Sequence, residues 1–167
     1  MRDIILVGHS YGGMPVTGVA DRMPRVIRRI VYLDALIPEN GERAFDTLPS
    51  GVEAARMKQV RERGAGIALP PPAEISIPPG PMRDWAQERV RPQPIGTYDT
   101  PLRLALPAGA GRPVTYIAFT GPANSAIEPS RQRAQHRADW RYEKMETPHD
   151  TPLIYPDRLA ERLDRIT

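Results

Sequence analysis

The 167-residue sequence contains no cysteine, so disulfide bonds and thiolate metal sites are excluded. Aromatic residues make up only 6% of the chain, and the formal net charge at pH 7 is only +3. No basic run is interleaved with aromatics, which argues against a nucleic-acid partner. No apolar run approaches the roughly 20 residues that a membrane span needs, and the N-terminus is too quickly polar for a signal peptide. We therefore expect a cytoplasmic protein without a membrane or nucleic-acid partner.

Proline is abundant, with 20 residues, whereas the usual share in proteins is about 5%. The composition shifts between residues 41 and 111, where prolines gather in the stretches 69–81 and 91–101. Proline bars regular central strands, so this region predicts irregular chain with two helices, over 50–63 and 81–90. We interpret 41–111 as a lid inserted over a site, with Ile67, Leu69 and Trp85 available for packing; the alternative is a disordered linker.

The flanking segments, 1–40 and 112–167, alternate strand and helix signals. Short apolar runs rich in β-branched residues predict strands within 4–7, 26–36, 113–120 and 140–146. Helical spacing follows over 13–23, 129–138 and 155–166. The scattered arginines of the predicted helices stand among acids, which is typical of faces exposed to water. This alternation predicts a single α/β domain with about four parallel strands flanked by helices.

The stretch "LVGHSYGGM", residues 6–14, places Gly8-x-Ser10-x-Gly12 directly between a predicted strand and a predicted helix. A serine displayed on such a tight turn needs glycines two positions to either side, so that neighbouring backbone can approach. The helix start beneath the serine supplies backbone N–H groups and a positive dipole end, suited to a developing oxyanion. This pattern predicts a nucleophile elbow; the alternative is an ordinary glycine-rich turn.

The stretch "ILVGHSYGGM" resembles the nucleophile elbow of the α/β-hydrolase superfamily. More narrowly, "IRRIVYLDALIPENG" (27–41) and "TPHDTPLIYPDRLAERL" (147–163) resemble its small-esterase branch, which includes hydroxynitrile lyases and plant methyl-ester esterases. The likeness covers about 1–45 and 81–167. It implies an α/β-hydrolase fold with a serine nucleophile, an acid and a histidine base, in that order along the chain.

Serine needs a base to take its proton, and the chain has three histidines. His9 lies inside the elbow, so we expect its side chain to point away from the serine and serve in packing. His136 lies on a strongly charged helical stretch and is expected at the surface. His149 follows the last predicted strand, at the sheet edge where α/β sites assemble, and is our candidate base.

The acid has two candidates. In the resembling superfamily it usually follows the penultimate strand, where this chain has Asn124, which carries no charge, and then Glu128. Asp34 ends the preceding strand, and an acid at that place is a known variation of the superfamily. We favour Asp34 over Glu128, although an aspartate there would also serve as a turn cap. Asp150 is too close to His149 in sequence to orient its ring easily.

In the resembling family about five strands precede or include the elbow strand, whereas here only residues 4–7 do. We therefore expect a partial α/β-hydrolase fold in which the elbow strand is an exposed edge that attracts a second copy of the chain. The resemblance implies that the Tyr11 N–H is one oxyanion donor. The second donor comes in the family from an earlier loop, and losing one donor costs about 100 to 1,000-fold in turnover.

These observations predict a serine hydrolase of carboxylesterase type that acts on a small ester, with Ser10, His149 and Asp34 as catalytic residues. The alternative is a catalytically impaired fragment of such an enzyme. A lesser alternative is a hydroxynitrile-lyase-like activity, for which the sequence offers no clear cyanide-holding lysine. No metal or organic cofactor is expected, because convincing ligands never occur together at metal-binding spacing.

Overall fold

The computed structural model describes residues 3–73 and 75–166 and contains a parallel four-stranded sheet. Its strands are β1 (Ile4–His9), β2 (Ile27–Leu33), β5 (Val114–Phe119) and β6 (Trp140–Met145), in the order β1-β2-β5-β6. All four strands fall on the predicted apolar runs, so the predicted α/β class with four parallel strands is confirmed. In the part of the chain that the structure describes, β1 is an edge strand of this sheet, as expected.

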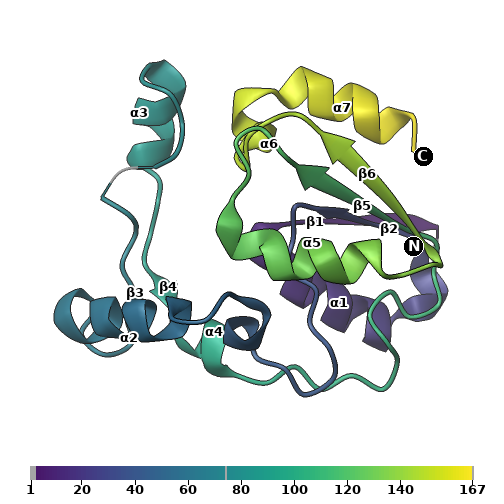
Figure 1. The fold of residues 1–167 in the computed structure, drawn as a ribbon, viewed down its shortest axis with the longest axis horizontal. Helices are drawn as coiled ribbons and strands as arrows, with labels where there is room; N and C mark the ends of the chain where they lie inside the picture. The colour runs from purple at the N-terminus through teal and green to yellow at the C-terminus, as the bar shows by residue number, and fades with distance from the viewer. Residues whose placement is uncertain (1–2, 74, 167) are drawn as a thin grey trace.

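Helices cover both faces of the sheet (Figure 1). Helices α1 (Gly13–Arg22) and α5 (Glu128–Gln135) lie on one face, and α6 (Thr151–Ile154) and α7 (Pro156–Asp164) lie on the other. The three-layer arrangement follows from the parallel strands, because each crossover connection places a helix on a face.

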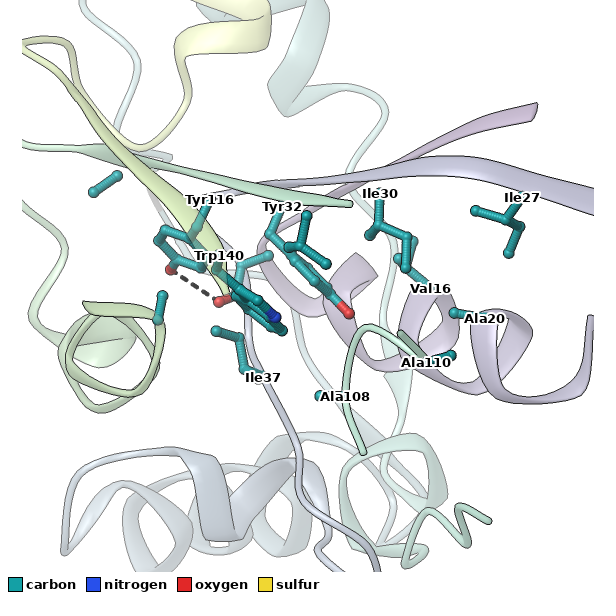
Figure 2. Packing of buried hydrophobic residues seen from close by; sticks show 14 residues of the cluster. Val16, Ala20, Ile27, Ile30, Tyr32, Ile37, Ala108, Ala110, Tyr116 and Trp140 are labelled. Atoms are coloured by element: carbon teal, nitrogen blue, oxygen red, sulfur yellow. Dashed lines mark hydrogen bonds between the residues drawn. The ribbon is translucent and has the colours of Figure 1, made fainter. Parts of the chain in front are cut away.

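The strands alternate their buried side chains between two cores. In β2, Ile30 and Tyr32 face α1 and α5, whereas Val31 and Leu33 face α7. Figure 2 shows the first core, in which the rings of Tyr32 and Trp140 stack at 5.4 Å between centroids. Burial on both faces is complete only in the central strand β5, whose six residues are all buried, whereas the edge strand β6 carries charged residues among its apolar ones.

The segment 41–111 forms an irregular excursion with short elements. These are a 3₁₀ turn (Ala44–Thr47), α2 (Val52–Arg63), β3 (Ala68–Leu69), α3 (Pro81–Gln87), β4 (Gln93–Pro94) and α4 (Gly96–Asp99). The two predicted helices are present, and β3 pairs antiparallel with β4. An apolar cluster that includes Phe45 and Tyr98 joins this segment to Met14 of α1.

Two of the three residues expected to pack the segment do not do so. Leu69 packs against the Phe45–Tyr98 cluster, but Ile67 is 71% exposed and Trp85 is 48% exposed. The expectation is wrong for these two because Trp85 lies on α3, which stands away from the sheet and its helices (Figure 1), and Ile67 lies in the exposed turn between α2 and β3. None of the helices in residues 3–73 and 75–166 has the length and apolar character needed to cross a bilayer.

Candidate active site

Ser10 occupies a strained turn between β1 and α1. Its φ is +54°, in the left-handed region that costs a non-glycine residue about 1–3 kcal/mol. The residues Ser10–Gly12 form a single 3₁₀ turn that leads directly into α1. The backbone carbonyl of Ser10 accepts a hydrogen bond from the Leu36 N–H, at 3.0 Å. The turn is therefore fixed to the chain that leaves the neighbouring strand β2.

The three glycines of the turn differ in whether the surrounding structure leaves space for a side chain. A Cβ at Gly8 would lie 2.7 Å from Val16 Cγ2 and 2.8 Å from the Gly12 carbonyl, so the steric expectation is confirmed there. A Cβ at Gly12 would meet nothing within 4 Å, so the same expectation is wrong for Gly12. The second tight position is Gly13, whose Cβ would lie 2.0 Å from the Leu36 carbonyl oxygen. The close approach is thus between the start of α1 and the chain after β2.

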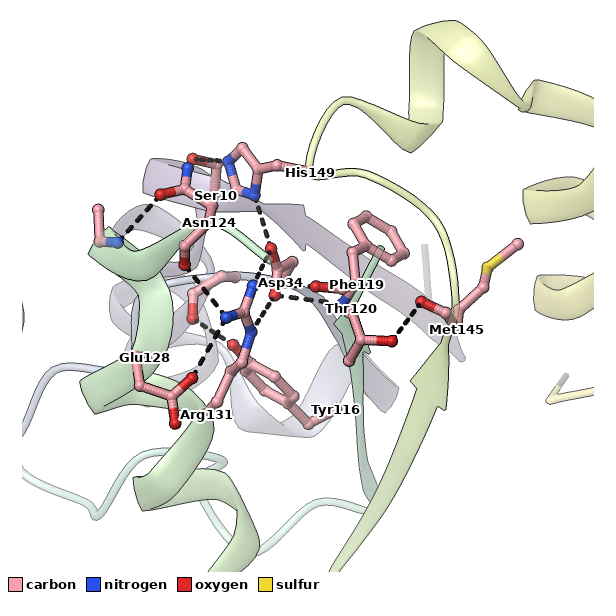
Figure 3. A network of polar contacts seen from close by, with 12 residues as sticks. Ser10, Asp34, Tyr116, Phe119, Thr120, Asn124, Glu128, Arg131, Met145 and His149 are labelled. Atoms are coloured by element: carbon pink, nitrogen blue, oxygen red, sulfur yellow. Dashed lines mark hydrogen bonds and ion pairs between the residues drawn. The ribbon is translucent and has the colours of Figure 1, made fainter. Parts of the chain in front are cut away.

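Two hydrogen bonds connect the three candidate catalytic residues (Figure 3). Ser10 Oγ lies 2.9 Å from His149 Nε2, and His149 Nδ1 lies 2.7 Å from Asp34 Oδ2. A carboxylate only accepts hydrogen bonds, so Nδ1 carries a proton. In the neutral ring Nε2 is then the acceptor, which leaves the Ser10 hydroxyl to donate to it. The imidazole is therefore in the tautomer that a general base for Ser10 needs.

These side chains meet because each follows a strand at the carboxyl edge of the parallel sheet. Ser10 follows β1, Asp34 follows β2, and His149 follows β6 by four residues. The β1–β2 register pairs His9 with Leu33, which sets Ser10 and Asp34 beside each other. Asp34 also has a positive φ of +44°, and its N–H donates to the Ile117 carbonyl at 2.8 Å. Carboxyl edges of such sheets are where α/β sites assemble.

The Asp34 carboxylate is fully buried, with no exposed side-chain surface. Burial by itself would raise the pKa of Asp34, but hydrogen bonds from His149 and Arg131 outweigh it and hold the pKa below its ordinary value. The Phe119 N–H also donates to Oδ1, at 3.2 Å. Asp34 is therefore a charged group that is paired and hydrogen-bonded, as a buried carboxylate must be.

The other acids take different partners. Glu128 is exposed, and its side chain accepts hydrogen bonds from Arg131 and Gln132. Asn124 accepts from the Ala126 N–H at 3.0 Å and so caps the 3₁₀ turn before α5. The geometry therefore brings Asp34, and not Glu128, to His149.

His9 lies against His149. Its Nε2 is 2.8 Å from the His149 backbone carbonyl, and the two ring centroids are 4.7 Å apart. Burial and the neighbouring His149 ring lower the pKa of His9. A neutral ring that donates from Nε2 thus supports the loop carrying His149, which agrees with the packing role expected for it. His136 is exposed, as expected.

Tyr11 follows Ser10 in the 3₁₀ turn and also ties the elbow to the inserted segment. Its hydroxyl donates to the Thr97 carbonyl at 2.9 Å, and its ring packs against Tyr98 with centroids 5.1 Å apart. The Tyr11 N–H as oxyanion donor stays a prediction. In residues 3–73 and 75–166, no three His, Asp or Glu side chains are grouped so that they could hold a metal ion.

Arg131 is the residue that the sequence reading missed. Its side chain is only 4% exposed, although the arginines of the predicted helices were expected in water. The signal was present in the spacing. Four residues are spaced at i, i+3, i+4 and i+7, which places them on one face of a helix, and all four are buried: Ile127, Ser130, Arg131 and Ala134. An arginine on the inward face of a helix must find acceptors, and here it finds Asp34.

Two adjoining hollows lie beside His149. The first has a volume of about 320 Å³ and is lined by Ser76, Pro122, Ala123, Asn124, Ser125, Pro148, His149 and Asp150. The second, of about 420 Å³, is lined mostly by apolar groups: Ile75, Ser76, Ile77, Pro78, Gly121, Pro122, Pro148, Ile154 and Tyr155. A third hollow, of about 470 Å³, lies beside the elbow and is lined by Tyr11, Met14, Pro15, Gly96, Thr97, Thr100, Pro101 and Leu102. The segment 41–111 contributes residues to the walls of all three hollows.

Known proteins with similar sequences are hydrolases. The model of the alpha/beta hydrolase family matches residues 1–162. The chain is 36% identical over 169 residues to the carbendazim hydrolyzing esterase of Nocardioides sp. (strain SG-4G), a match that covers 96% of this chain and 70% of that protein.

Solved structures with the same fold share less sequence. An extracellular alpha/beta-hydrolase from a Paenibacillus species matches with a TM-score of 0.76 and 22% identity, over 99% of this chain and 72% of that one. A pyrethroid hydrolase from Sphingobium faniae JZ-2 matches with a TM-score of 0.76 and 20% identity, over 99% of this chain and 70% of that one. Because the sequence identities are only 22% and 20%, these matches show that the fold is shared and carry no information about the substrate.

Proposed function

This chain belongs to the alpha/beta hydrolase family and is a hydrolase that acts on ester bonds, and from this premise we propose that it cleaves a small ester with Ser10 as nucleophile, His149 as general base and Asp34 as the acid that orients His149. The observation that carries the proposal is the pair of hydrogen bonds from Ser10 Oγ to His149 Nε2 and from His149 Nδ1 to Asp34. Each atom that must exchange a proton is already within hydrogen-bonding distance of its partner.

The reaction proceeds in two halves. His149 Nε2 takes the Ser10 proton while Oγ forms a bond to the ester carbonyl carbon, and the carbonyl oxygen becomes an oxyanion. The carbon–oxygen bond to the alcohol then breaks, and His149 returns the proton to the leaving alkoxide. Water next gives a proton to His149 and attacks the acyl carbon, after which Ser10 leaves with that proton. The products are one carboxylic acid and one alcohol for each water consumed.

Asp34 contributes through charge and orientation. Its carboxylate holds Nδ1–H and stabilises the imidazolium that forms when Ser10 is deprotonated. Because the pKa of Asp34 is held below its ordinary value by His149 and Arg131, despite its burial, the carboxylate stays ionised through the cycle. The backbone N–H of Tyr11, at the start of the helical turn, is the proposed donor to the oxyanion.

The walls of the site favour a small ester with an apolar portion. The hollow beside His149 is of mixed polarity, and it shares Ser76, Pro122 and Pro148 with the apolar hollow next to it. We place the reacting ester group at the first hollow and an apolar substituent in the second. The inserted segment supplies Ile75 and Ile77 to this wall, which supports its assignment as a lid.

The test uses a fluorophosphonate probe and 4-nitrophenyl acetate on purified, folded protein. The probe is expected to label the wild-type chain at Ser10 and to leave Ser10→Ala unlabelled, and Ser10→Ala is expected to lose hydrolysis. Ser125, which lines the hollow beside His149, provides a control serine, so Ser125→Ala is expected to retain labelling. Equal labelling of wild type and Ser10→Ala would refute the proposal, and so would an unlabelled wild type that is folded.

A further inference from the structure

Arg131 of α5 reaches the Asp34 carboxylate from the side opposite His149 (Figure 3). Its Nε donates to Asp34 Oδ1 at 2.8 Å, and its Nη2 donates to Asp34 Oδ2 at 2.9 Å. Parallel N–H donors on both oxygens form the bidentate pairing that the planar guanidinium makes best. The pair is buried, with the two side chains 4% and 0% exposed.

The remaining donors of Arg131 hold the loops around the site. Nη2 also donates to the Phe119 carbonyl at 3.0 Å, and Nη1 donates to the Asn124 carbonyl at 3.1 Å and to Glu128 Oε2 at 3.3 Å. All five N–H bonds of the guanidinium therefore have an acceptor. One side chain thus joins the ends of β2 and β5, the loop after β5 and the start of α5.

The hydrogen-bond acceptor positions of the Asp34 carboxylate are likewise all occupied. Oδ1 accepts from Arg131 Nε and the Phe119 N–H, and Oδ2 accepts from Arg131 Nη2 and His149 Nδ1. A carboxylate offers about four such acceptor positions. With all of them occupied, rotation of the carboxylate breaks at least one hydrogen bond, so Oδ2 stays directed at His149.

We propose that Arg131 is a positioning residue of the active site, which sets the orientation of Asp34 toward His149 and the pH range of the reaction. This inference rests on the proposed function. The guanidinium shares the negative charge of Asp34, so less of that charge acts on the imidazolium formed during catalysis. Removing the positive charge strengthens the attraction between Asp34 and the imidazolium, and the acidic limb of the pH profile is then expected to move to higher pH.

The other titratable residues that face the Asp34–His149 pair are the same in the wild type and in the Arg131 variants. They are Tyr116 of β5, Glu128 of α5, His9 of β1 and Asp150 beside His149. The Tyr116 hydroxyl donates a hydrogen bond to the Ala35 carbonyl. Glu128 accepts from Nη1 of Arg131, the guanidinium nitrogen that does not contact Asp34.

Arg133 provides a matched control on the same helix. Its Nη1 and Nη2 donate hydrogen bonds to the two carboxylate oxygens of Glu42. Nη1 also donates to the Ile37 carbonyl. Glu42 is bonded to Arg133 and to the Glu39 N–H, away from Asp34. If the role of Arg131 were purely structural, Arg131→Lys, like Arg133→Lys, would change the folded fraction and leave kcat per folded protein and the pH profile unchanged.

The experiment measures kcat and KM for 4-nitrophenyl acetate between pH 5 and 9, with folding monitored by circular dichroism. Lysine keeps the charge but cannot hold both carboxylate oxygens in a fixed plane. Arg131→Lys is expected to lower kcat by about 10 to 100-fold with KM within about twofold, since small misplacements of catalytic groups cost this much. Arg131→Gln, which removes the charge, is expected to shift the acidic limb upward by at least about 0.5 pH unit. Arg133→Lys is expected to change neither.

A double variant keeps the test decisive if single variants unfold. Loss of one partner of a buried ion pair leaves a costly unpaired charge, whereas replacing both partners is tolerated better. Since Arg131 acts through Asp34, Asp34→Asn with Arg131→Gln is expected to match the kcat of Asp34→Asn within about twofold. A further tenfold loss would overturn the proposal, as would Lys variants of Arg131 and Arg133 with equal kcat and pH profiles. Ser10→Ala distinguishes these outcomes from failure of the proposed function, because it tests the nucleophile alone.

Discussion

The carbonyl oxygen of Leu36 lies where a side chain of Gly13 would begin, only 2.0 Å from the position of its Cβ. Together with the hydrogen bond from the Leu36 N–H to the Ser10 carbonyl, this contact packs the start of α1 directly onto the chain that follows Asp34. The turn that carries Ser10 and the turn that carries Asp34 thus support each other.

This contact predicts that Gly13→Ala is severely destabilising. The added methyl group meets backbone that cannot rotate away, so the start of α1 or the chain at Leu36 must move. Overpacking of this kind costs about 1–3 kcal/mol, and occasionally more. Urea unfolding should show a loss of at least about 2 kcal/mol. Gly12→Ala is the control, because its Cβ has open space; equal stability of the two variants would contradict the packing described.

Asp34→Asn is expected to lower kcat by about 10³ to 10⁴-fold, because an amide can stabilise the wrong imidazole tautomer and carries no charge. Glu128→Gln is expected to change kcat by less than threefold, since Glu128 is exposed and bonds Arg131 and Gln132. Steady-state kinetics on 4-nitrophenyl acetate measures both. The reverse order of effects would transfer the acid role to Glu128.

His9 is expected to make the protein less stable as the pH falls. Burial and His149 lower the pKa of His9 below 6.5, so the unfolded chain binds a proton there more readily than the folded one. The stability that neutral His9 contributes is fully present above about pH 6.5 and is lost as pH falls toward its folded-state pKa.

His9→Gln tests this linkage. The glutamine amide can still donate to the His149 carbonyl but does not titrate in this range. The free energy of unfolding, measured in urea at pH 7.5 and 5.5, should therefore fall less in His9→Gln than in the wild type. His136→Gln, at an exposed histidine, should keep the wild-type difference. A wild-type pH dependence in His9→Gln would show that His9 does not carry the effect.

The proposed place of the apolar substituent predicts a change in chain-length preference. Each buried methylene is worth about 0.8 kcal/mol, or roughly fourfold in rate. Ile154→Ser should therefore lower the ratio of kcat/KM for 4-nitrophenyl hexanoate to that for the acetate by about fivefold. Leu102→Ser alters the hollow beside Tyr11 instead and should leave the ratio unchanged. If only Leu102→Ser changes the ratio, the substituent binds on the elbow side. The ratio is unaffected by partial unfolding, because both esters meet the same folded fraction.

Much of the fold follows from local pattern. The four strands lie where short apolar runs with β-branched residues stand, and their alternation with helical spacing forces parallel pairing with helices on the faces. The nucleophile elbow could be predicted from the sequence for the same reason, because a glycine-flanked serine between a strand and a helix is a local arrangement. Even there the local pattern pointed to Gly12, whereas the tight contact belongs to Gly13 and involves Leu36, a residue 23 positions away.

The sequence by itself determined the candidate serine, the candidate base and a short choice of candidate acids, since these depend on residue type and on the order of strands along the chain. Only the tertiary structure decided among partners that are distant in sequence. Asp34 meets His149 across 115 positions, and Arg131 meets Asp34 across 97. Arginine looks the same in sequence whether it faces water or a buried carboxylate. Its environment is fixed by which helix face packs on which strand ends, and burial there pairs Arg131 with the Asp34 carboxylate of the candidate site.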